Sequence, residues 1–379
     1  MKIVCMISFM NRGAGAQQAI MRLSQQLRLR GHSAEVWFLY RRSDVDTLDL
    51  TSRCILDGKL TLPRLIFLPV YLVRGLREVR PDAVISFLPL ANTLGLLSAW
   101  LAGVTVRISS HRAPAYTYSA PMRIADRILG AAGFYTAIVC VSRAVQQSFQ
   151  AYPSTYRTRL EVVHNGIAWQ GSSSSRLDAR RKLGLPLTGF LFVAAGRLSK
   201  QKNYPLLLEA FARTKNSYLA IAGDGELESE LAAFARKLDL GERVFFLGAL
   251  DRRLIPDLLR SADAFVSSSL FEGQSNAVLE AMHEGLPILV SDIPEQRETV
   301  VDEATGEACA LLAAVSDTSV WTAQLQRLIE SADLRQQLAT SAQQMVARRF
   351  TVERMIDGFE QVLLSARASP SDLPEPHYP

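Results

Sequence analysis

The chain has 379 residues, about twice the usual size of a domain, and its 48 % apolar and 21 % charged residues exclude a wholly disordered protein. Its four cysteines form no closely spaced pair, which excludes a zinc ribbon or a disulfide scaffold and favours a reducing compartment. Residues 1–170 hold 20 basic and 9 acidic residues and the remainder holds 22 and 28, so the net charge of +5 conceals a basic first half that favours an anionic partner.

The first half of the chain alternates short apolar runs with helical patterns. The apolar run at residues 3–10 is too short for a signal peptide and lacks a small-residue cleavage site, so it predicts a buried first strand. Nearly continuous apolar strands separated by amphipathic helices predict a parallel sheet covered on both faces. The strands predicted in this half are 2–9, 34–39, 83–87, 104–109, 136–141 and 160–163.

One stretch of the first half is long enough to cross a bilayer. Residues 83–106 carry no charge over 24 positions. A proline, two polar residues and a glycine between positions 89 and 95 interrupt them. The stretch therefore predicts a strand at 83–87 and a buried helix at 91–102, and no membrane-spanning helix is expected.

Residues 59–80 mix apolar side chains with one lysine and four arginines. This pattern is typical of a segment lying in an anionic membrane interface, and equally of a surface helix whose arginines are solvated. The basic charge of the first half does not identify its anionic partner, because a membrane surface, a nucleic acid and a phosphorylated substrate are all anionic. Neither a nucleic-acid motif nor a run of interleaved aromatic and basic residues occurs, so no nucleic-acid partner is expected.

The two halves meet near residue 170. Asn165-Gly166 predicts a turn, and the Ser/Gly run at 170–175 predicts a flexible connector. Two similar α/β lobes joined by a hinge predict a ligand-binding cleft between them, at the carboxyl ends of the strands. The strands predicted in the second half are 190–195, 218–222, 244–247, 264–267 and 287–290.

The end of the chain predicts one further element. Thr351 is a suitable N-cap for a final helix, and the proline-rich stretch after it is typical of disorder. The expected organisation is a first domain at 1–168, a second domain at 169–350, a helix at 351–366 and a disordered tail at 367–379.

The strongest local pattern surrounds the start of the helix predicted at 277–284. Ser275 or Asn276 is a suitable N-cap, and the helix start offers N–H groups and a partial positive charge that together suit an anion. Glu280 lies one turn inside this helix and Glu272 lies in the loop before it. Such carboxylates are suited to hold hydroxyl groups on either side of a bound diphosphate, and an ordinary surface loop and helix is the alternative.

Two strand-end loops of the second half carry further candidates. Gly196 permits a tight exit from its strand, and Arg197 and Lys202 then place two cations at the carboxyl end of that strand, where a phosphate group is their natural partner. A solvated surface loop is the alternative. The turn Gly223-Asp224-Gly225 carries two glycines that allow the backbone to approach a ligand closely.

The first half offers weaker signals. Gly13 and Gly15 follow the first strand and open a helix, but Gln18 stands where a dinucleotide fingerprint requires its third glycine, which excludes that cofactor site. His111 follows a predicted strand at the end where ligands bind, although a single histidine also suits a structural role.

Together these segments resemble the retaining glycosyltransferases of the GT-B fold, specifically family 4. The resemblance covers residues 1–366 and takes its specificity from the combination, because each piece alone is common. It implies an α/β fold of two Rossmann-like parallel-sheet domains that face each other across a cleft, with a C-terminal helix crossing back to the first domain. The segments that occur in the family's order are Gly13-x-Gly15, His111, His164-Asn165-Gly166, Gly196-Arg197 with Lys202, Gly223-Asp224-Gly225 and Glu272-x7-Glu280.

The resemblance also implies a role for each matching residue. Arg197 and Lys202 are similar to the pair that binds the donor diphosphate and stabilises the leaving group, Glu272 to the residue that contacts the donor sugar, and His111 to the histidine near the reacting sugar. Glu280 is similar to the ligand of the ribose hydroxyls. The other residues implied in substrate binding are Gly13 and Gly15 in a closing loop, Gly223, Asp224, Leu250 in the loop that reads the base, Gly273, and Ser275, Asn276 and Ala277 at the distal phosphate.

By this resemblance, the activity is transfer from a nucleotide sugar, with a UDP-sugar expected, to a lipid-linked or polysaccharide acceptor. The setting implied is synthesis of cell-surface glycans such as lipopolysaccharide, in the cytoplasm or peripherally on the anionic inner face of a bacterial membrane. No cofactor and no metal is expected, because Arg197, Lys202 and a helix start stabilise the charge of the leaving diphosphate. The motif Asp44-x-Asp46 lies in a polar loop without the rest of a metal site.

Gln274 and Ser275-Asn276 depart from the residues common in the family, at positions that shape the sugar pocket, so the sequence does not identify the donor sugar. One alternative keeps the fold and takes a soluble phosphorylated or small-molecule acceptor. Another is a catalytically inactive GT-B scaffold, which the presence of both cations and both glutamates disfavours.

Overall fold

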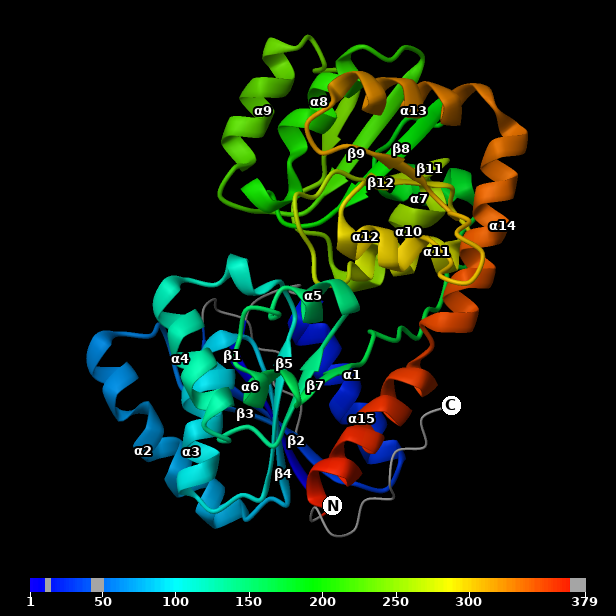
Figure 1. Cartoon of the computed structure of the whole chain (residues 1–379). Coiled ribbons are helices and arrows are strands. Elements are labelled where there is room, and N and C mark those ends of the chain that lie inside the picture. The colour runs from blue at the N-terminus through cyan, green and yellow to red at the C-terminus, as the bar shows by residue number, and fades with distance from the viewer. Residues whose placement is uncertain (11–14, 42–50, 369–379) are drawn as a thin grey trace. The chain divides into compact units, whose positions relative to one another are not determined.

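The computed structural model of the chain describes residues 1–10, 15–41 and 51–368 (Figure 1). It divides into two compact units. One comprises residues 1–166 and the chain from 353 onward, and the other comprises 167–352. The boundaries expected from the sequence, at 168 and 350, each lie two residues away.

Within the described residues, the first unit contains a sheet of seven parallel strands in the order β3-β2-β1-β4-β5-β6-β7. The near-continuous apolar runs account for six of these strands. The β3 strand was not predicted, because this partly exposed edge strand includes Ser52 and Arg53 and lacks an apolar run. The strands are β1 (Lys2–Met10), β2 (Ser33–Arg41), β3 (Ser52–Leu56), β4 (Ala83–Phe87), β5 (Val106–His111), β6 (Ala137–Cys140) and β7 (Leu160–Val162).

Helices cover both faces of this sheet (Figure 1). Residues of β1 alternate between the faces, so Ile3 and Cys5 pack against one layer while Val4 and Met6 pack against the other. The first layer consists of α1 (Gly15–Leu29) and α15 (Val352–Arg367). The second includes α2 (Leu62–Val79), α3 (Leu96–Leu101), α4 (Ala120–Ala131), α5 (Arg143–Gln147) and α6 (Ser154–Arg157).

The uncharged stretch at 83–106 forms the elements that the sequence predicts. It contains β4, a buried π-helical turn at Ala91–Gly95 and α3. No helix within the described ranges is both long and apolar enough to span a bilayer.

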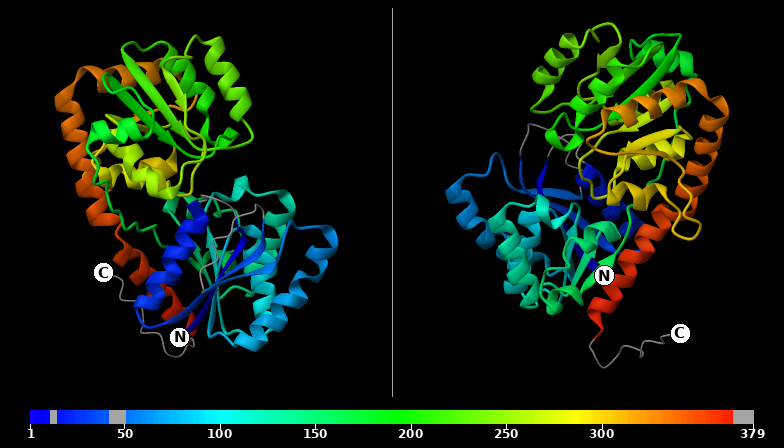
Figure 2. Two further views of the ribbon diagram at one scale, coloured as in Figure 1. Left: turned by 180° about the vertical axis from the view of Figure 1, so that it is seen from behind. Right: turned by 45° about the horizontal axis from the view of Figure 1, so that its top comes forward.

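The final helix, α15, belongs to the first unit, as the family resemblance implies. Figure 2 shows it in red near α1, in blue. Arg30, just after α1, donates to Asp357 at 2.8 Å and to Glu360 at 3.0 Å, and the ring of Phe359 stacks on that of Phe87 at 6.4 Å. These contacts and the apolar packing of α15 fix the helix on the sheet.

Within the described residues, the second unit contains a sheet of six parallel strands in the order β10-β9-β8-β11-β12-β13. The β13 strand, only three residues long, was not predicted. The strands are β8 (Phe190–Ala195), β9 (Ser217–Ala222), β10 (Val244–Phe246), β11 (Ala264–Ser267), β12 (Ile288–Ser291) and β13 (Leu311–Ala313).

Helices again form a layer on each face of the second sheet. One layer is formed by α8 (Tyr204–Ala212), α9 (Glu228–Lys237) and α13 (Thr318–Glu330). The other is formed mainly by α10 (Ile255–Ser261), α11 (Asn276–Glu284) and α14 (Ala332–Arg349). The unit also contains α7 (Arg176–Lys182) and α12 (Pro294–Val300).

The stretch predicted to be a flexible connector is instead held against the second unit, so that prediction is wrong. Trp169 Nε1 donates to Glu284 Oε2 at 3.0 Å, and the hydroxyl of Ser172 donates to Asp257. Ser175 then caps α7. Serine and glycine predict flexibility only where their polar groups face water, and here the hydroxyls of Ser172 and Ser175 have partners in the protein.

Candidate functional site

In the second unit, the structure brings together two loops that lie about 70 residues apart in the sequence. The 3-10 turn Lys200–Lys202 follows β8, and Glu272 lies in the loop after β11. Lys202 Nζ is 2.6 Å from Glu272 Oε1, and Glu272 is only 7 % exposed. The hydroxyl of Ser269 donates to the same carboxylate oxygen at 2.7 Å. The pair therefore fixes a cation at the carboxyl edge of the second sheet.

Further hydrogen bonds hold the two loops in register. Gln201 donates to the carbonyl of Phe271 at 3.0 Å and accepts from the amide of Leu270 at 2.8 Å. The hydroxyl of Ser268 donates to the carbonyl of Lys202 at 2.7 Å. These residues were not among the candidates predicted from the sequence, although a run of serines at the end of a predicted strand is a usable signal for such a clamp.

The glycines in this region are required by close packing between loops. A Cβ added at Gly223, where φ is +143°, would lie 2.0 Å from the carbonyl oxygen of Gly196. A Cβ at Gly225 would lie 2.4 Å from the carbonyl oxygen of Leu198. These glycines therefore admit the neighbouring loop, and their expected close approach to a ligand stays a prediction. Asp224 takes part in the same contact, because its carbonyl accepts from the Leu198 amide at 2.8 Å.

Arg197 differs from Lys202 in having no partner. Its side chain is exposed, and no residue in the described part of the chain makes a hydrogen bond or ion pair with it. The adjacent Gly196 lies against the Lys202 side chain, whose Cε would be 2.7 Å from an added Cβ. At the end of β8, Lys202, which is fixed by an ion pair, thus lies near Arg197, which has no partner among the described residues.

The loop after Glu272 leads into α11. Ser275 is the N-cap, and its hydroxyl accepts from the amide of Val278 at 3.4 Å. Gly273 is buried, whereas Asn276 and Ala277 are partly exposed in the first turn, ahead of the first residue whose amide bonds within the helix. This geometry is compatible with an anion at the helix start.

Glu280 has a partner that the sequence analysis missed. It is only 2 % exposed and forms an ion pair with Arg252, which follows the loop containing Leu250. Leu250 itself packs partly against the core of the second unit. The Asp-Arg-Arg sequence at 251–253 was the available signal for a charged partner, but sequence spacing alone does not show which carboxylate it meets.

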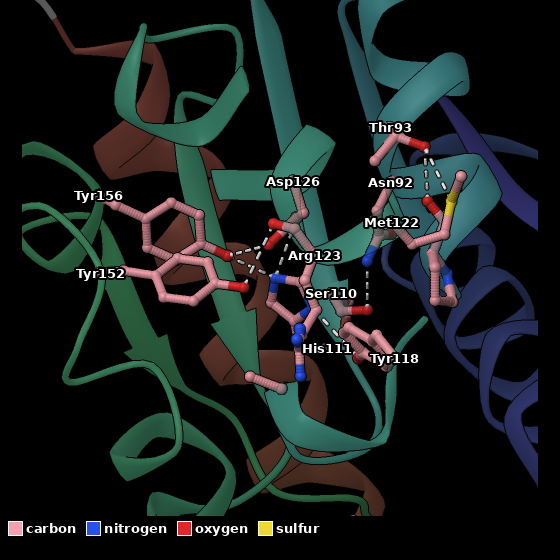
Figure 3. Close-up of polar contacts among 12 residues, drawn as sticks. Asn92, Thr93, Ser110, His111, Tyr118, Met122, Arg123, Asp126, Tyr152 and Tyr156 are labelled. Carbon is pink, nitrogen blue, oxygen red and sulfur yellow. Dashed lines mark hydrogen bonds and ion pairs between the residues drawn. The ribbon is translucent and has the colours of Figure 1, made fainter. Parts of the chain in front are cut away.

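In the first unit, His111 ends β5 and lies in a buried polar cluster (Figure 3). Its Nε2 is 2.8 Å from the hydroxyl of Tyr156, and its Nδ1 is 3.2 Å from that of Tyr118. Tyr156 in turn donates to Asp126 at 2.7 Å. Burial lowers the pKa of His111, and the negative charge of Asp126 opposes that shift. The ring is 1 % exposed, so its implied contact with a sugar stays a prediction.

The remaining residues considered in the sequence analysis lie near the start of the chain and at the boundary between the two units. Gly13 and the Asp44-x-Asp46 motif lie outside the described residues, and Gly15 is the first residue of α1. Asn165 and Gly166 each accept a hydrogen bond from an arginine, from Arg112 and Arg22 respectively.

Two family models match the chain. The model described as Glycosyltransferase Family 4 matches residues 13–168, and that described as Glycosyl transferases group 1 matches 175–345. Together they cover most of both units.

Individual proteins are similar over shorter stretches. An Escherichia coli UDP-Gal:alpha-D-GlcNAc-diphosphoundecaprenol alpha-1,3-galactosyltransferase is 28 % identical over 62 % of this chain and 64 % of its own length. The lipopolysaccharide core biosynthesis glycosyltransferase LpsE of Rhizobium meliloti is 28 % identical over 55 % of this chain and 59 % of its own. The chain thus spans less than two thirds of the length of these curated relatives.

Among solved structures, the fold resembles that of Anabaena Alr3699/HepE in complex with UDP-glucose. The TM-score is 0.82 with 20 % identity, and the likeness covers 96 % of this chain and 99 % of that one. WaaG, a glycosyltransferase involved in lipopolysaccharide biosynthesis, gives a TM-score of 0.73 at 17 % identity, over 97 % and 100 % of the two chains. With two Rossmann-like parallel-sheet units and both family models matched, this chain belongs to the GT-B glycosyltransferases.

Proposed function

We propose that the protein transfers a sugar from a nucleotide sugar, and that the donor binds at the carboxyl edge of the second sheet. The observation that carries this proposal is the Lys202–Glu272 pair beside the unpartnered cation of Arg197. Glu272 and its hydrogen bonds keep Lys202 in place before the donor arrives. A cation that is already positioned stabilises developing negative charge without reorganisation during the reaction.

The chemistry of this edge suits departure of a nucleoside diphosphate. Cleavage of the bond between the sugar and the distal phosphate leaves negative charge on that phosphate, where Lys202, Arg197 and the first turn of α11 supply positive potential. Glu280 is the acceptor for the ribose hydroxyls, and Glu272 contacts the donor sugar.

The expected base is uracil. Support comes from the E. coli relative, which is named for UDP-Gal, and from the Anabaena neighbour solved with UDP-glucose. Calorimetric titration of the metal-free protein with UDP, GDP and ADP tests this, with Arg197→Ala as the variant and Lys200→Ala as the control. Lys200 is a nearby exposed cation without a proposed role. The proposal is supported if UDP binds saturably and if Arg197→Ala, but not Lys200→Ala, weakens that binding. It would be overturned if the folded protein bound none of the three nucleotides.

Transfer is proposed to retain the anomeric configuration and to need no metal, as the family resemblance implies. In that mechanism the acceptor attacks from the face that the diphosphate leaves, and Arg197 and Lys202 supply the charge stabilisation. Proton NMR of the first product formed from an α-linked donor tests the first statement, because an α-linked product is expected and a β-linked product contradicts it. An unchanged rate in the presence of EDTA is expected for the second, and loss of turnover contradicts it.

The acceptor is proposed to be lipid-linked or a growing glycan at an anionic membrane surface, in bacterial cell-surface glycan synthesis. The relatives named for a diphosphoundecaprenol acceptor and for lipopolysaccharide core synthesis support this. So does α2, which buries one row of leucines and exposes a second apolar row consisting of Leu62, Ile66, Phe67, Val70 and Tyr71.

Arginines and apolar side chains line the same surface of the first unit. A groove of about 940 Å³ beside α2 is lined by Val70, Arg74, Arg77, Glu78 and Arg80 from α2 and its C-cap, and by Leu101 from α3. Arg74 lies 3.6 Å from Glu78, so the three arginines outnumber one carboxylate there. Apolar side chains fringed by arginines favour an interface with anionic lipid, at which the protein would be peripheral.

Sedimentation with phosphatidylglycerol vesicles tests the membrane contact, with phosphatidylcholine vesicles as the neutral comparison. Binding is expected to fall with added salt and in Ile66→Ser. The matched control is Leu364→Ser, which replaces an apolar side chain of equal exposure, 64 %, on α15. Equal binding of the two variants, or no binding to anionic vesicles, would remove the membrane proposal.

A further inference from the structure

The carboxyl edge of the first sheet holds an arginine without an acidic partner. Arg112 directly follows β5. Its guanidinium donates to the side-chain oxygen of Asn165 and lies over the ring of Phe87, 4.7 Å from the ring centroid. No carboxylate in the described part of the chain contacts it. The pKa of Arg112 is lowered to about 9, mainly by burial, and the nearby positive charge of Arg22 contributes to this shift.

Other arginines of this chain show what a purely structural guanidinium looks like. Arg180 is buried and donates to Asp263 and to three backbone carbonyls, and Arg107 donates to four backbone carbonyls. A guanidinium has five N–H donors, and Arg112 uses one, toward an amide oxygen. Arg112 is half-buried, and a cation that is partly removed from water is normally matched by an anion.

A second cation acts on the same place. Arg22, from α1, donates to the carbonyl of Gly166 at 2.6 Å. Its positive charge contributes to the lowered pKa of Arg112. The adjacent residues Asn165 and Gly166 therefore hold two like charges near each other. An anion that contacts both guanidinium groups relieves this repulsion and supplies acceptors to the unused donors of Arg112.

We propose that Arg112 and Arg22 bind a phosphoryl group of the acceptor substrate. This rests on the proposed function, which gives the donor to the second unit and the membrane contact for a lipid-linked acceptor to α2 of the first. The ligand class is a phosphate monoester or diphosphate, whose oxygens match the fork of an arginine. Two sources share that chemistry, the headgroup of a lipid-linked sugar diphosphate and a soluble sugar phosphate.

Calorimetric binding of inorganic diphosphate to the full-length chain tests the site. All variants carry Arg197→Ala and Lys202→Met, which remove the cations of the proposed donor site. Arg112→Gln is expected to weaken diphosphate binding by about tenfold or more, the effect of losing one charged hydrogen-bonding partner. The control is Arg157→Gln, which removes the same charge from an exposed position on α6. Equal affinities of the two variants, or no diphosphate binding in the parent, would overturn the proposal.

A structural role for Arg112 gives a different result. If Arg112 only holds Asn165, its substitution lowers thermal stability and leaves diphosphate affinity unchanged in the folded fraction. Arg22→Gln provides a second test from another element, and the same loss of diphosphate affinity is expected. If Arg112→Gln does not fold, Arg22→Gln alone decides between loss and retention of binding.

Two further arms identify the source of the phosphate and separate this proposal from the proposed function. Displacement of diphosphate by vesicles containing a polyprenyl diphosphate identifies a lipid-linked acceptor, and displacement by a soluble hexose phosphate identifies a soluble one. Displacement by neither would overturn the assignment to an acceptor. UDP affinity of Arg112→Gln on the otherwise unchanged chain is expected to equal that of the wild type. Failure of the wild type to bind UDP would instead count against the donor site.

Discussion

The ion pair between Lys202 and Glu272 gives the sharpest prediction, through the substitution Lys202→Met. The two charged atoms are 2.6 Å apart, and the side chains are 16 % and 9 % exposed. Methionine preserves the length of the side chain but leaves the Glu272 carboxylate buried with only hydroxyl and amide donors. Breaking a buried pair in this way costs about 3–5 kcal/mol, and the residual exposure of Lys202 places the expected cost near the lower end. For a unit of this size, about 3 kcal/mol lowers Tm by about 6–12 °C.

The double variant Lys202→Met with Glu272→Gln separates stability from catalysis. Without the unpaired carboxylate, the free energy of unfolding is expected to return to within about 1 kcal/mol of the wild-type value. Turnover is not expected to return, because the leaving diphosphate still lacks its cation, and a loss of about 10²-fold or more remains. Thermal denaturation followed by circular dichroism measures the first quantity, and release of nucleoside diphosphate measures the second.

Two results would refute this reasoning. If Lys202→Met has the wild-type Tm, the buried pair is not formed in solution. If the double variant regains turnover together with stability, Lys202 holds the loop and does not stabilise the leaving group.

Three other substitutions test separate parts of the account. Gly223→Ala is expected to destabilise the second unit by about 3 kcal/mol or more in denaturant unfolding, because the added Cβ meets the carbonyl of Gly196 at 2.0 Å. Glu280→Gln is expected to weaken UDP binding by about tenfold in calorimetry, since an amide replaces the proposed ribose acceptor. Asp126→Asn removes the negative charge that raises the pKa of His111, so NMR titration is expected to give a pKa still further below 6.5.

Each of these three predictions has an outcome that contradicts it. For the glycine, Gly241→Ala is the control, because a Cβ at that position meets nothing within 4 Å, and equal stability of the two variants would contradict the packing argument. Wild-type UDP affinity in Glu280→Gln would refute the ribose assignment. An unchanged His111 pKa in Asp126→Asn would show that burial alone sets it.

The buried strands could be predicted from the sequence because a strand that is buried on both faces consists of a continuous apolar run. The five residues 83–87 are all buried, and their predicted bounds match β4. β5 begins and ends two residues later than predicted, and its last residue is His111. Val104 is apolar and so extended the predicted strand, but the pairing with β4 begins only at Val106. β3 and β13 were missed because an edge strand and a three-residue strand leave no run long enough to recognise.

The pairings within the site could not be predicted, because they join distant loops. Lys202 and Glu272 were each identified as candidates, but their ion pair depends on how the loops after β8 and β11 fold together. Arg252 and Arg112 were not identified, since arginines outside regular strands and long helices are typical of solvated surface and only the structure shows their neighbours. The connector illustrates the opposite error, in which composition suggested flexibility and specific hydrogen bonds removed it.

Transfer of radiolabelled sugar from a panel of UDP-sugars to a bacterial membrane extract tests whether the edge of the second sheet that carries Lys202 is the donor site. The folded double variant Lys202→Met with Glu272→Gln is the reference. The wild type is expected to move label from at least one UDP-sugar into the lipid or glycan fraction, at a rate about 10²-fold or more above that of the double variant. Equal rates for the two proteins would contradict the assignment of the donor site to this edge of the second sheet.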